Sequence, residues 1–270
     1  MNKRASLQQP PRQLPWLGAA VDVGVDFPAV DSAWGRDDPA PGLLAAGGDL
    51  SVATLRNAYS HGIFPWFSEG QPILWWSPEP RMVLHTVDFK LHPSFLKTLK
   101  RFLNSPGCEI RIDHDFASVI SACANASRNG LPESQTSTWI LAEMQAAYCA
   151  LHATGMAHSI ETWVNGELVG GLYCTSIGSA VFGESMFARR TDASKIALAA
   201  LVALCRAQGV AWIDCQQNTR HLASLGAREM AREEFCGLAA LAATKPNLDW
   251  RMKSVKWHTL DPRLNKPTTP

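Results

Sequence analysis

The apolar positions of residues 179–217 predict a strand, a loop, a buried helix and a second strand. Residues 179–187 carry β-branched and aromatic side chains between turn signals. Residues 195–206 are apolar on every side, which is typical of a helix packed between two layers. Gly209 ends this helix, and VAWIDCQ then returns as a second extended run. We expect the two strands to be parallel, with a right-handed crossover through the helix.

Polar side chains lie near the ends of these two strands. Because side chains alternate along a strand, Glu184 and Met186 share one face of the first strand. By the same rule, Asp214 and Gln216 share one face of the second strand. Ligands of open α/β sheets bind beyond the carboxyl ends of such strands. The pattern therefore predicts a ligand site that contains these four residues.

The order strand, loop, helix, strand resembles the cofactor-binding half of the GNAT N-acyltransferase fold. In acyl-CoA enzymes of that fold, the loop before the helix is rich in glycine, so that its N–H groups can bind a pyrophosphate. Here the loop 188–194 reads ARRTDAS and contains no glycine. A GNAT-like scaffold in this chain is therefore expected to use an acyl donor other than coenzyme A.

The N-terminal part of the chain predicts an irregular extension followed by a small domain. Residues 1–40 contain scattered Pro, Gly and Asp without a sustained period, and we expect the first dozen to be disordered. Further along, Ser51 is a good N-cap and Gly62 a good C-cap for one helix. Four prolines within 65–80 exclude a helix and predict a rigid aromatic loop. Such a loop either plugs a small core or walls a pocket.

The segment 92–104 predicts a sharply amphipathic helix, which follows a strand at 82–89. Its apolar residues fall on one arc, whereas Lys97, Lys100 and Arg101 fall on the other at helical spacing. These three cations form either a solvated face or a contact for a polyanion.

The whole pattern predicts an α+β fold with a mixed sheet. We divide the chain into an irregular extension (1–40), a small N-terminal α/β domain (41–90), a GNAT-like acyltransferase domain (91–250) and a basic flexible tail (251–270). The remaining elements expected in the large domain are a strand at 109–113, helices at 116–126, 138–155 and 219–245, a polar loop at 127–138, and a hairpin turning at 165–166.

Composition narrows the class of protein. With 270 residues, 46% of them hydrophobic, the chain can build one large core and a small second domain. Its 25 basic and 24 acidic residues leave a net charge of +1, so affinity for nucleic acid would need a local patch. Seven cysteines without a C-x-x-C pair indicate a reducing cytosol. The eight histidines show no metal-ligand spacing, so no metal is expected.

The start of the chain does not read as a signal peptide, because MNKR is followed by no apolar core. The longest apolar run, residues 196–205, is too short to span a bilayer. We therefore expect a cytoplasmic protein that has no membrane partner.

Taken together, the motifs resemble those of the bacterial leucyl/phenylalanyl-tRNA–protein transferases. The similarity runs from Gly42 to Asp249, and FPWF…LWWSPEPR, FGESMF and DCQ are its most specific parts. Further matching text is GLLAAGGDLS, TWI, AHSIETW, ELVGGLY, DASK and HLASLGA. The resemblance implies a small N-terminal domain packed on a GNAT-like domain. It also implies transfer of Leu or Phe, and less well Met, from aminoacyl-tRNA to proteins with an N-terminal Lys or Arg, which marks them for the N-degron pathway.

Such a reaction is aminolysis of an activated ester, so it requires no ATP, cofactor, metal or covalent enzyme intermediate. The resemblance and this chemistry together assign Asp214 as the group that orients the amine and takes up its proton, with Gln216 fixing Asp214 or the amine. Glu184 is expected beside Gln216, where it holds Gln216 or the aminoacyl amine. The competing interpretation is a salt bridge from Glu184 to Arg189 or Arg190.

Other residues are expected to hold the aminoacyl-tRNA. Met186, Trp139 and Leu172 would shape the pocket for Leu or Phe, although core packing is the simpler interpretation of Leu172 alone. Trp66 and Tyr59 would stack on the terminal adenine, with core packing as an equal alternative. The basic face of 92–104 would contact acceptor-stem phosphates through Lys97, Lys100 and Arg101. His221, near Asn218, is interpreted as a buried hydrogen-bonded histidine.

The chain departs from the family pattern in its N-terminal extension, its longer 127–138 loop and its basic tail. Leu172 and Ala188 also replace Met and Ser of some members, which could alter the side-chain preference. Two other functions stay open: an acyl-CoA-dependent N-acyltransferase, and a tRNA-binding module without catalysis. No carboxylate is marked in the sequence for reading the acceptor's Lys or Arg side chain.

Overall fold

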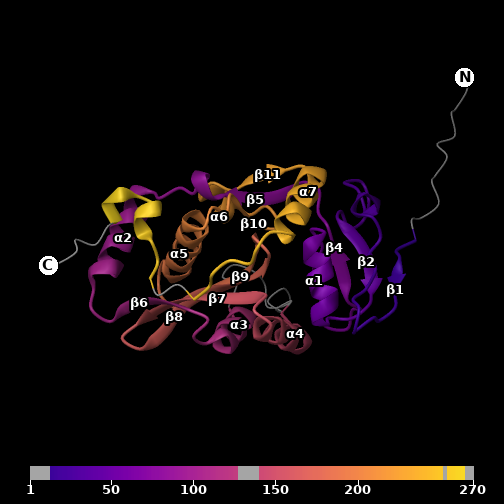
Figure 1. The fold of residues 1–270 in the computed structure, drawn as a ribbon, viewed down its shortest axis with the longest axis horizontal. Helices are drawn as coiled ribbons and strands as arrows, with labels where there is room; N and C mark the ends of the chain where they lie inside the picture. The colour runs from indigo at the N-terminus through magenta and orange to yellow at the C-terminus, as the bar shows by residue number, and fades with distance from the viewer. Residues whose placement is uncertain (1–12, 127–139, 252–253, 265–270) are drawn as a thin grey trace, which may run out of the picture.

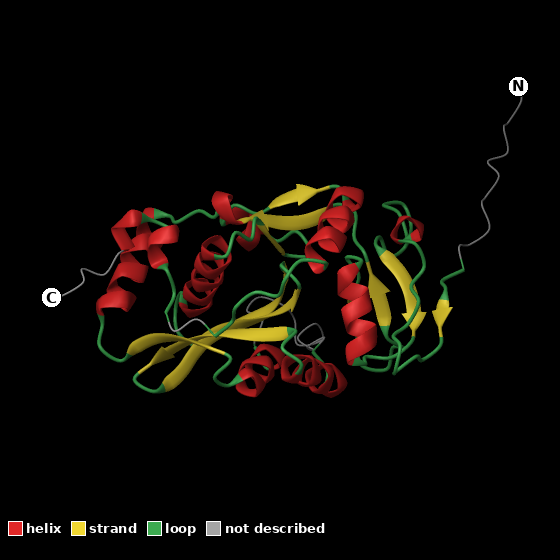
Figure 2. Cartoon of the chain, viewed as in Figure 1, coloured by secondary structure: helices red, strands yellow, loops and turns green. Residues whose placement is uncertain are grey.

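The computed structural model describes residues 13–126, 140–251 and 254–264. The chain forms a four-stranded and a seven-stranded sheet with helices packed on both, which is the mixed α+β class that the pattern predicts (Figures 1 and 2). In the part of the chain described, no helix is both long and apolar enough to cross a membrane. All seven cysteines are free, as expected for a chain without a disulfide framework.

The smaller sheet lies at one end of the molecule, with α1 (Val52–Ser60) on its inner side (Figure 1). Helix α1 begins where predicted, because the Ser51 side chain accepts a hydrogen bond from Thr54 N at 3.2 Å. After the helix, Gly62 adopts φ +74°, a conformation that favours glycine. The strand order is β1–β2–β4–β3, with bounds Trp16–Leu17, Leu43–Gly47, Leu74–Trp76 and Phe64–Pro65.

The larger sheet has the order β11–β5–β10–β9–β8–β7–β6, and only β9 and β10 in it pair in parallel, as predicted for residues 179–217. Its strands are β5 (Arg81–His85), β6 (Cys108–Ile112), β7 (Ala157–Val164), β8 (Glu167–Ile177), β9 (Ala180–Ala188), β10 (Trp212–Asp214) and β11 (Arg228–Met230).

Helices cover both faces of this sheet (Figure 1). Along β8, Tyr173 points into one hydrophobic cluster, while Leu172 and Cys174 point into a second, as the alternation of a strand requires. Helices α3 (Phe116–Ala124) and α4 (Ala142–Ala153) build the first cluster. Helices α2 (Pro93–Asn104) and α5 (Ala193–Ala207) build the second.

Helix α5 is buried on nearly every side, with Ala199 and Val202 both fully inaccessible to solvent. Its all-round apolar sequence therefore predicted its position correctly. The hairpin turn is also confirmed, because Asn165 and Gly166 both adopt positive φ between β7 and β8.

Three expectations about organisation are wrong. The strand expected at 82–89 forms β5, but it pairs with β10 and β11 in the larger sheet. The division between the two sheets therefore falls between Trp76 and Arg81 rather than at residue 90. A strand can join a distant sheet through backbone hydrogen bonds alone, which its own sequence does not reveal.

The helix expected at 219–245 is interrupted. It forms α6 (Arg220–Ser224), β11 and α7 (Arg232–Ala243). Gly226 breaks it with φ +106°, where a Cβ atom would lie 2.1 Å from the Asp88 carbonyl oxygen. The close approach of another chain segment thus overrides the helical pattern.

The tail is not loose throughout, because residues 254–264 form two 3₁₀ turns, η4 (Trp257–Thr259) and η5 (Pro262–Leu264). Leu264 is only 4% exposed, so the apolar residues of this segment anchor it to the core. The N-terminal extension is mostly irregular over 13–40, as expected. The expected disorder of the first dozen residues and the polar loop 127–138 lie outside the described residues.

The close packing of α5 on β8 predicts the effect of a single methyl group. A Cβ atom at Gly170 would lie 2.5 Å from the Ala193 Cβ and 2.9 Å from its carbonyl carbon. Gly170→Ala should therefore destabilise the protein by about 1–3 kcal/mol, measured by urea unfolding. Gly237→Ala is the matched control, because Gly237 lies in α7 with open space around it. That control should stabilise by roughly 0.5–1 kcal/mol, and equal effects at both sites would contradict the packing.

Candidate active site

Two adjoining cavities lie where β10 ends beside the middle of β9. The first has a volume of about 280 Å³ and an apolar wall, and the second has about 220 Å³ and an aromatic wall. Both are lined by Glu184 and Cys215, so the two cavities meet at these residues. The first also contains Leu172, Met186 and Asp214 in its lining, and the second contains Trp66 and Gln216.

The backbone opens this site by letting two parallel strands separate. Strand β10 pairs with β9 through Asp214 and Phe182, and β10 ends there while β9 continues. At the same place β9 contains a bulge. The consecutive β8 residues Tyr173 and Cys174 pair with Ser185 and Gly183, which are two positions apart in β9. Glu184 is the extra residue of this bulge. A bulge redirects a side chain next to a functional site, and here Glu184 lines both cavities.

A buried ion pair supports the floor of the site. Arg81 and Asp214 are 1% and 0% exposed, and they form two hydrogen bonds, Nε to Oδ1 at 2.8 Å and Nη2 to Oδ2 at 2.6 Å. The guanidinium also donates to the Gly62 carbonyl at 3.1 Å and lies between the rings of Phe64 and Phe235. The carboxylate that the sequence assigns to proton uptake is therefore already bound by a cation on both oxygens.

Asp214 also fixes the residue that follows the strand. Its Oδ1 accepts a hydrogen bond from the Gln216 backbone N–H at 2.9 Å. Gln216 has φ +59°, a left-handed conformation that is uncommon for residues other than glycine and clusters at functional sites. The prediction that Asp214 and Gln216 share one face of an extended strand is wrong, because β10 ends at Asp214. The turn, rather than strand alternation, brings the amide of Gln216 to Glu184.

Glu184 lies at the centre of a hydrogen-bond network. Its Oε2 accepts from Gln216 Nε2 at 3.1 Å and from the Tyr148 hydroxyl at 3.4 Å, and Tyr148 in turn shares a short hydrogen bond with Tyr59. Its Oε1 is buried and has no partner among the described residues. Burial raises the pKa of Glu184 to about 7. The predicted contact between Glu184 and Gln216 is confirmed.

The competing salt bridge to the loop arginines is wrong. Arg189 donates to the Leu168 carbonyl at 3.0 Å, and Arg190 pairs with Glu167 at 3.1 Å. Both cations thus have partners at the start of β8, outside the Glu184 network.

The aromatic candidates have different positions. Trp66 is half-buried and lines the second cavity, and its ring centroid lies 5.4 Å from that of Trp76. Tyr59 is fully buried with its ring 5.0 Å from that of Phe182. Core packing, the alternative that the sequence left open for Tyr59, is therefore what the structure has, and its ring is not exposed for stacking on an adenine. Trp139 lies outside the described residues.

The apolar candidates face each other across two strands. Leu172 on β8 is paired in register with Met186 on β9, and both line the first cavity. His221 on α6 lines the same cavity and is exposed, so the interpretation of a buried histidine is wrong. Sequence analysis missed Arg81 and Tyr148 because their partners are far away in the chain. Arg81 is the last residue of the WWSPEPR motif, and that motif was the available signal for it.

The basic helix lies apart from these cavities. Lys97, Lys100 and Arg101 are on the solvent side of α2, at the end of the molecule opposite the four-stranded sheet (Figure 1). Helix α2 buries Phe95 and Leu99 instead. The structure thus separates the expected polyanion contact from the expected chemistry.

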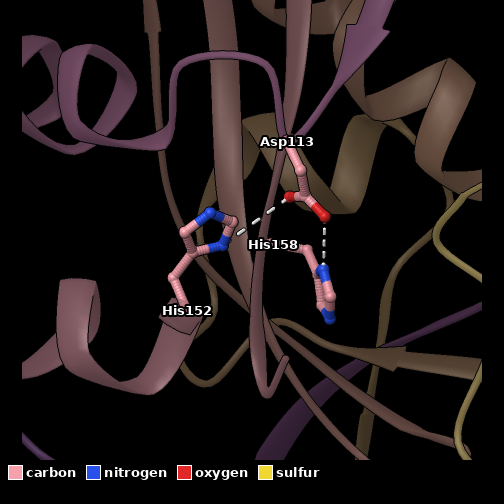
Figure 3. A group of neighbouring side chains, drawn as sticks. All are labelled: Asp113, His152 and His158. Atoms are coloured by element: carbon pink, nitrogen blue, oxygen red, sulfur yellow. Dashed lines mark hydrogen bonds and ion pairs between the residues drawn. The ribbon is translucent and has the colours of Figure 1, made fainter. Parts of the chain in front are cut away.

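A second polar cluster joins β6, α4 and β7, where Figure 3 shows the Asp113 carboxylate directed toward His152 and His158. The three side chains offer donor atoms within 4.8 Å of one another, as a metal site would require. His158 Nδ1 lies 2.7 Å from Asp113 Oδ2, and its Nε2 lies 3.0 Å from the Gly155 carbonyl. His152 Nδ1 lies 2.8 Å from the Ala157 carbonyl. These hydrogen bonds account for the cluster without an ion, and none of the three side chains lines the two cavities.

With this geometry in place, comparison with known proteins identifies the family. The model of the leucyl/phenylalanyl-tRNA protein transferase matches residues 83–240, and the model of its N-terminal domain matches residues 48–79. The chain belongs to the leucyl/phenylalanyl-tRNA–protein transferase family. It is therefore an aminoacyltransferase.

Curated relatives match over almost their whole length. A leucyl/phenylalanyl-tRNA–protein transferase of Polaromonas sp. is 58% identical over 260 residues, which cover 96% of this chain and 98% of the relative. A protein of the same name from Albidiferax ferrireducens is 60% identical over 257 residues, with coverage of 94% and 96%. The two family models meet near residues 79–83, which agrees with the division between the two sheets.

The buried ion pair predicts a large loss of stability when one partner is removed. Arg81→Met leaves the Asp214 carboxylate buried without its cation, which should cost about 3–5 kcal/mol in urea unfolding. The double variant Arg81→Met/Asp214→Leu should recover part of that loss, because no buried charge remains.

The matched control is Arg190→Met, which removes an exposed cation that pairs with Glu167. Its effect should be below about 1 kcal/mol. A single Arg81→Met variant as stable as this control would show that the pair does not support the site.

Proposed function

We propose that this protein transfers leucine or phenylalanine, and less well methionine, from aminoacyl-tRNA to the α-amino group of proteins that begin with Lys or Arg. The modification would mark those proteins for degradation through the N-degron pathway. The observation that carries the proposal is the meeting of an apolar and an aromatic-walled cavity at Glu184 and Gln216. An aminoacyl-adenosine end has the same two parts, an apolar side chain and a base, joined at the reacting ester.

The apolar cavity suits the side chain of the transferred amino acid. Its volume of about 280 Å³ and its lining by Leu172, Met186, Leu198 and Ile213 suit an apolar side chain such as that of Leu, Phe or Met. Met186 is flexible and polarisable, so it can pack against side chains of different shape. The neighbouring cavity, with Trp66 on its wall, would take the terminal adenine by stacking.

Glu184 is our candidate for the group that takes the proton of the attacking amine. A general base works best when its pKa lies near the working pH, and burial raises the pKa of Glu184 to about 7. Its buried Oε1 has no partner among the described residues, so one acceptor position of the carboxylate is unused beside the cavities. Asp214, held by Arg81, is then a positioning residue, because it sets the turn that carries Gln216.

The proposed step balances without a further reactant. The nitrogen lone pair of the acceptor amine attacks the ester carbonyl, and a C–N bond replaces the C–O bond to the ribose. The amine proton passes to Glu184 and from there to the leaving ribose oxygen. Because the ester is already activated, the reaction as written requires no ATP, metal or cofactor.

The scaffold that we infer for this chemistry is GNAT-like. Support comes from the parallel strands β9 and β10, which separate beyond Asp214, and from the buried helix α5 that connects them. We divide the chain into an N-terminal part with the four-stranded sheet and a catalytic part that begins at β5. The free cysteines support a reducing compartment, and we place the reaction in the cytoplasm.

A transfer assay tests the function directly. The protein is mixed with leucyl-tRNA and a peptide that begins with Arg, and mass spectrometry should find the peptide extended by one leucine. The same peptide with an acetylated N-terminus should remain unchanged, because it lacks the attacking amine. Valyl-tRNA should be used more slowly by about 10–200-fold, since the pocket discriminates only by apolar contacts.

Two controls complete the assay. A peptide that begins with Glu should not be extended, which separates recognition of Lys or Arg from general aminolysis. Leucyl-CoA should not replace leucyl-tRNA as donor. Absence of an extended Arg peptide, or equal use of the thioester, would contradict the proposal.

A further inference from the structure

The C-terminal segment, residues 254–264, folds directly against helix α2 (Figure 1, yellow and purple). Leu264 of this segment and Phe95, Leu99 and Phe102 of α2 belong to the same hydrophobic cluster. Between the two elements runs a groove of about 570 Å³, with Phe102 and Leu103 on one wall and Ser254, Lys256, Trp257 and His258 on the other. The segment is thus part of the same surface as the basic face of α2.

Arg206 at the end of α5 fixes the segment in this place. Its Nη1 donates to the Thr259 carbonyl at 2.7 Å, and its Nε donates to the Thr86 carbonyl at 2.8 Å. In addition, the Thr259 hydroxyl donates to the Ala203 carbonyl at 3.2 Å. The backbone of the segment is therefore held against α5, unlike that of a flexible tail.

These two elements concentrate positive charge on a nearly neutral protein. Helix α2 contains three cations and no carboxylate, and the C-terminal segment contains two cations and one carboxylate, so together they have a net charge of +4. The whole chain has a net charge of only +1. The cations concerned are Lys97, Lys100, Arg101, Lys256 and Arg263.

Asp261 is the one carboxylate of the pair of elements, and it connects them. Arg263 donates to both of its oxygens, at 2.9 and 2.6 Å. The pKa of Asp261 is lowered to about 2, first by the hydrogen bond from Arg263 and in smaller part by the charge of Lys100. Arg263 thus pairs with this carboxylate directly, and the charge of Lys100 on α2 acts on it as well. The groove also contains Glu109, whose carboxylate is paired with Arg111 at 2.6 Å.

We propose that helix α2 and the C-terminal segment form one phosphate-binding surface for the tRNA donor, in which Lys256 and Arg263 extend the contacts made by α2. The inference rests on the proposed function, because it takes the donor to be aminoacyl-tRNA. A protein of low net charge gains affinity for a polyanion only from a local patch, and the patch described here holds the excess cations. A duplex acceptor stem presents phosphates in rows, which two adjacent rigid elements can contact together.

The double variant Lys256→Gln/Arg263→Gln tests the segment. Each lost phosphate contact should flatten the plot of log K for leucyl-tRNA against log salt by about 0.9, so the slope should fall by about one to two units. The kcat/KM for leucyl-tRNA should fall relative to that for leucyl-adenosine, which is too short to reach the surface. Equal thermal unfolding of variant and wild type would show that folding is retained.

The matched control is Arg36→Gln/Lys245→Gln, which removes two exposed cations outside the two elements. It changes the net charge by the same amount, and its salt slope should stay at the wild-type value. Asp261→Asn provides a change of opposite sign, because it removes the carboxylate that competes with phosphate for Arg263. That variant should bind leucyl-tRNA more tightly at low salt, which a purely structural role of Asp261 would not produce.

The outcomes separate this inference from the proposed function. If Lys97→Gln/Lys100→Gln/Arg101→Gln flattens the slope and the C-terminal variant does not, the segment does not bind tRNA, and the proposed function stands. If the C-terminal variant instead loses binding to vesicles of anionic phospholipid at an unchanged tRNA slope, the surface serves a membrane, and the inference is overturned. Failure of wild-type protein to use leucyl-adenosine would count against the proposed function alone.

Discussion

The buried ion pair between Arg81 and Asp214 is the interaction on which the site depends. Arg81 begins β5, next to the division between the two sheets, and also binds the Gly62 carbonyl after α1. Asp214 ends β10 and holds the backbone N–H of Gln216. One guanidinium thus links the smaller sheet's helix to the strand end at which the two cavities open. Because both partners are buried, loss of either leaves an uncompensated charge at this junction.

The same framework gives two neighbouring carboxylates different properties. Asp214 shares two hydrogen bonds with the guanidinium of Arg81. Among the described residues, Glu184 accepts hydrogen bonds from the hydroxyl of Tyr148 and the amide of Gln216, and burial raises its pKa to about 7. A difference of this kind between adjacent acids separates a positioning role from a proton-transfer role. The bulge in β9 then places Glu184 between the apolar cavity and the aromatic-walled cavity.

The sequence predicts those parts of the fold that depend on local pattern. The apolar helix α5, the Ser51 cap and the turn at Asn165 follow from periodicity and turn chemistry, and the structure has all three. The pairing of β9 with β10 also follows, since a helix connects them.

What the sequence cannot give depends on contacts between distant residues. Arg81 and Asp214 are 133 positions apart, and the burial of Tyr59 depends on Tyr148 and Phe182. The left-handed turn at Gln216 and the bulge at Glu184 are likewise set by neighbouring strands, so the sequence indicated Glu184, Asp214 and Gln216 but not their arrangement.

The central claim is that Glu184 accepts the proton of the attacking amine, and the pH dependence of transfer tests it most directly. The kcat/KM for transfer from leucyl-adenosine to an Arg-ended peptide should be measured between about pH 5.5 and 9 in wild type and Glu184→Gln. A base acts when deprotonated, so the wild-type rate should rise with pH through the Glu184 pKa of about 7. A second rise should follow near about 8, where the peptide amine loses its proton. Glu184→Gln should be slower by about 10²–10⁴-fold and should retain only the second rise. A variant with the wild-type rate, or with both rises unchanged, would contradict the account.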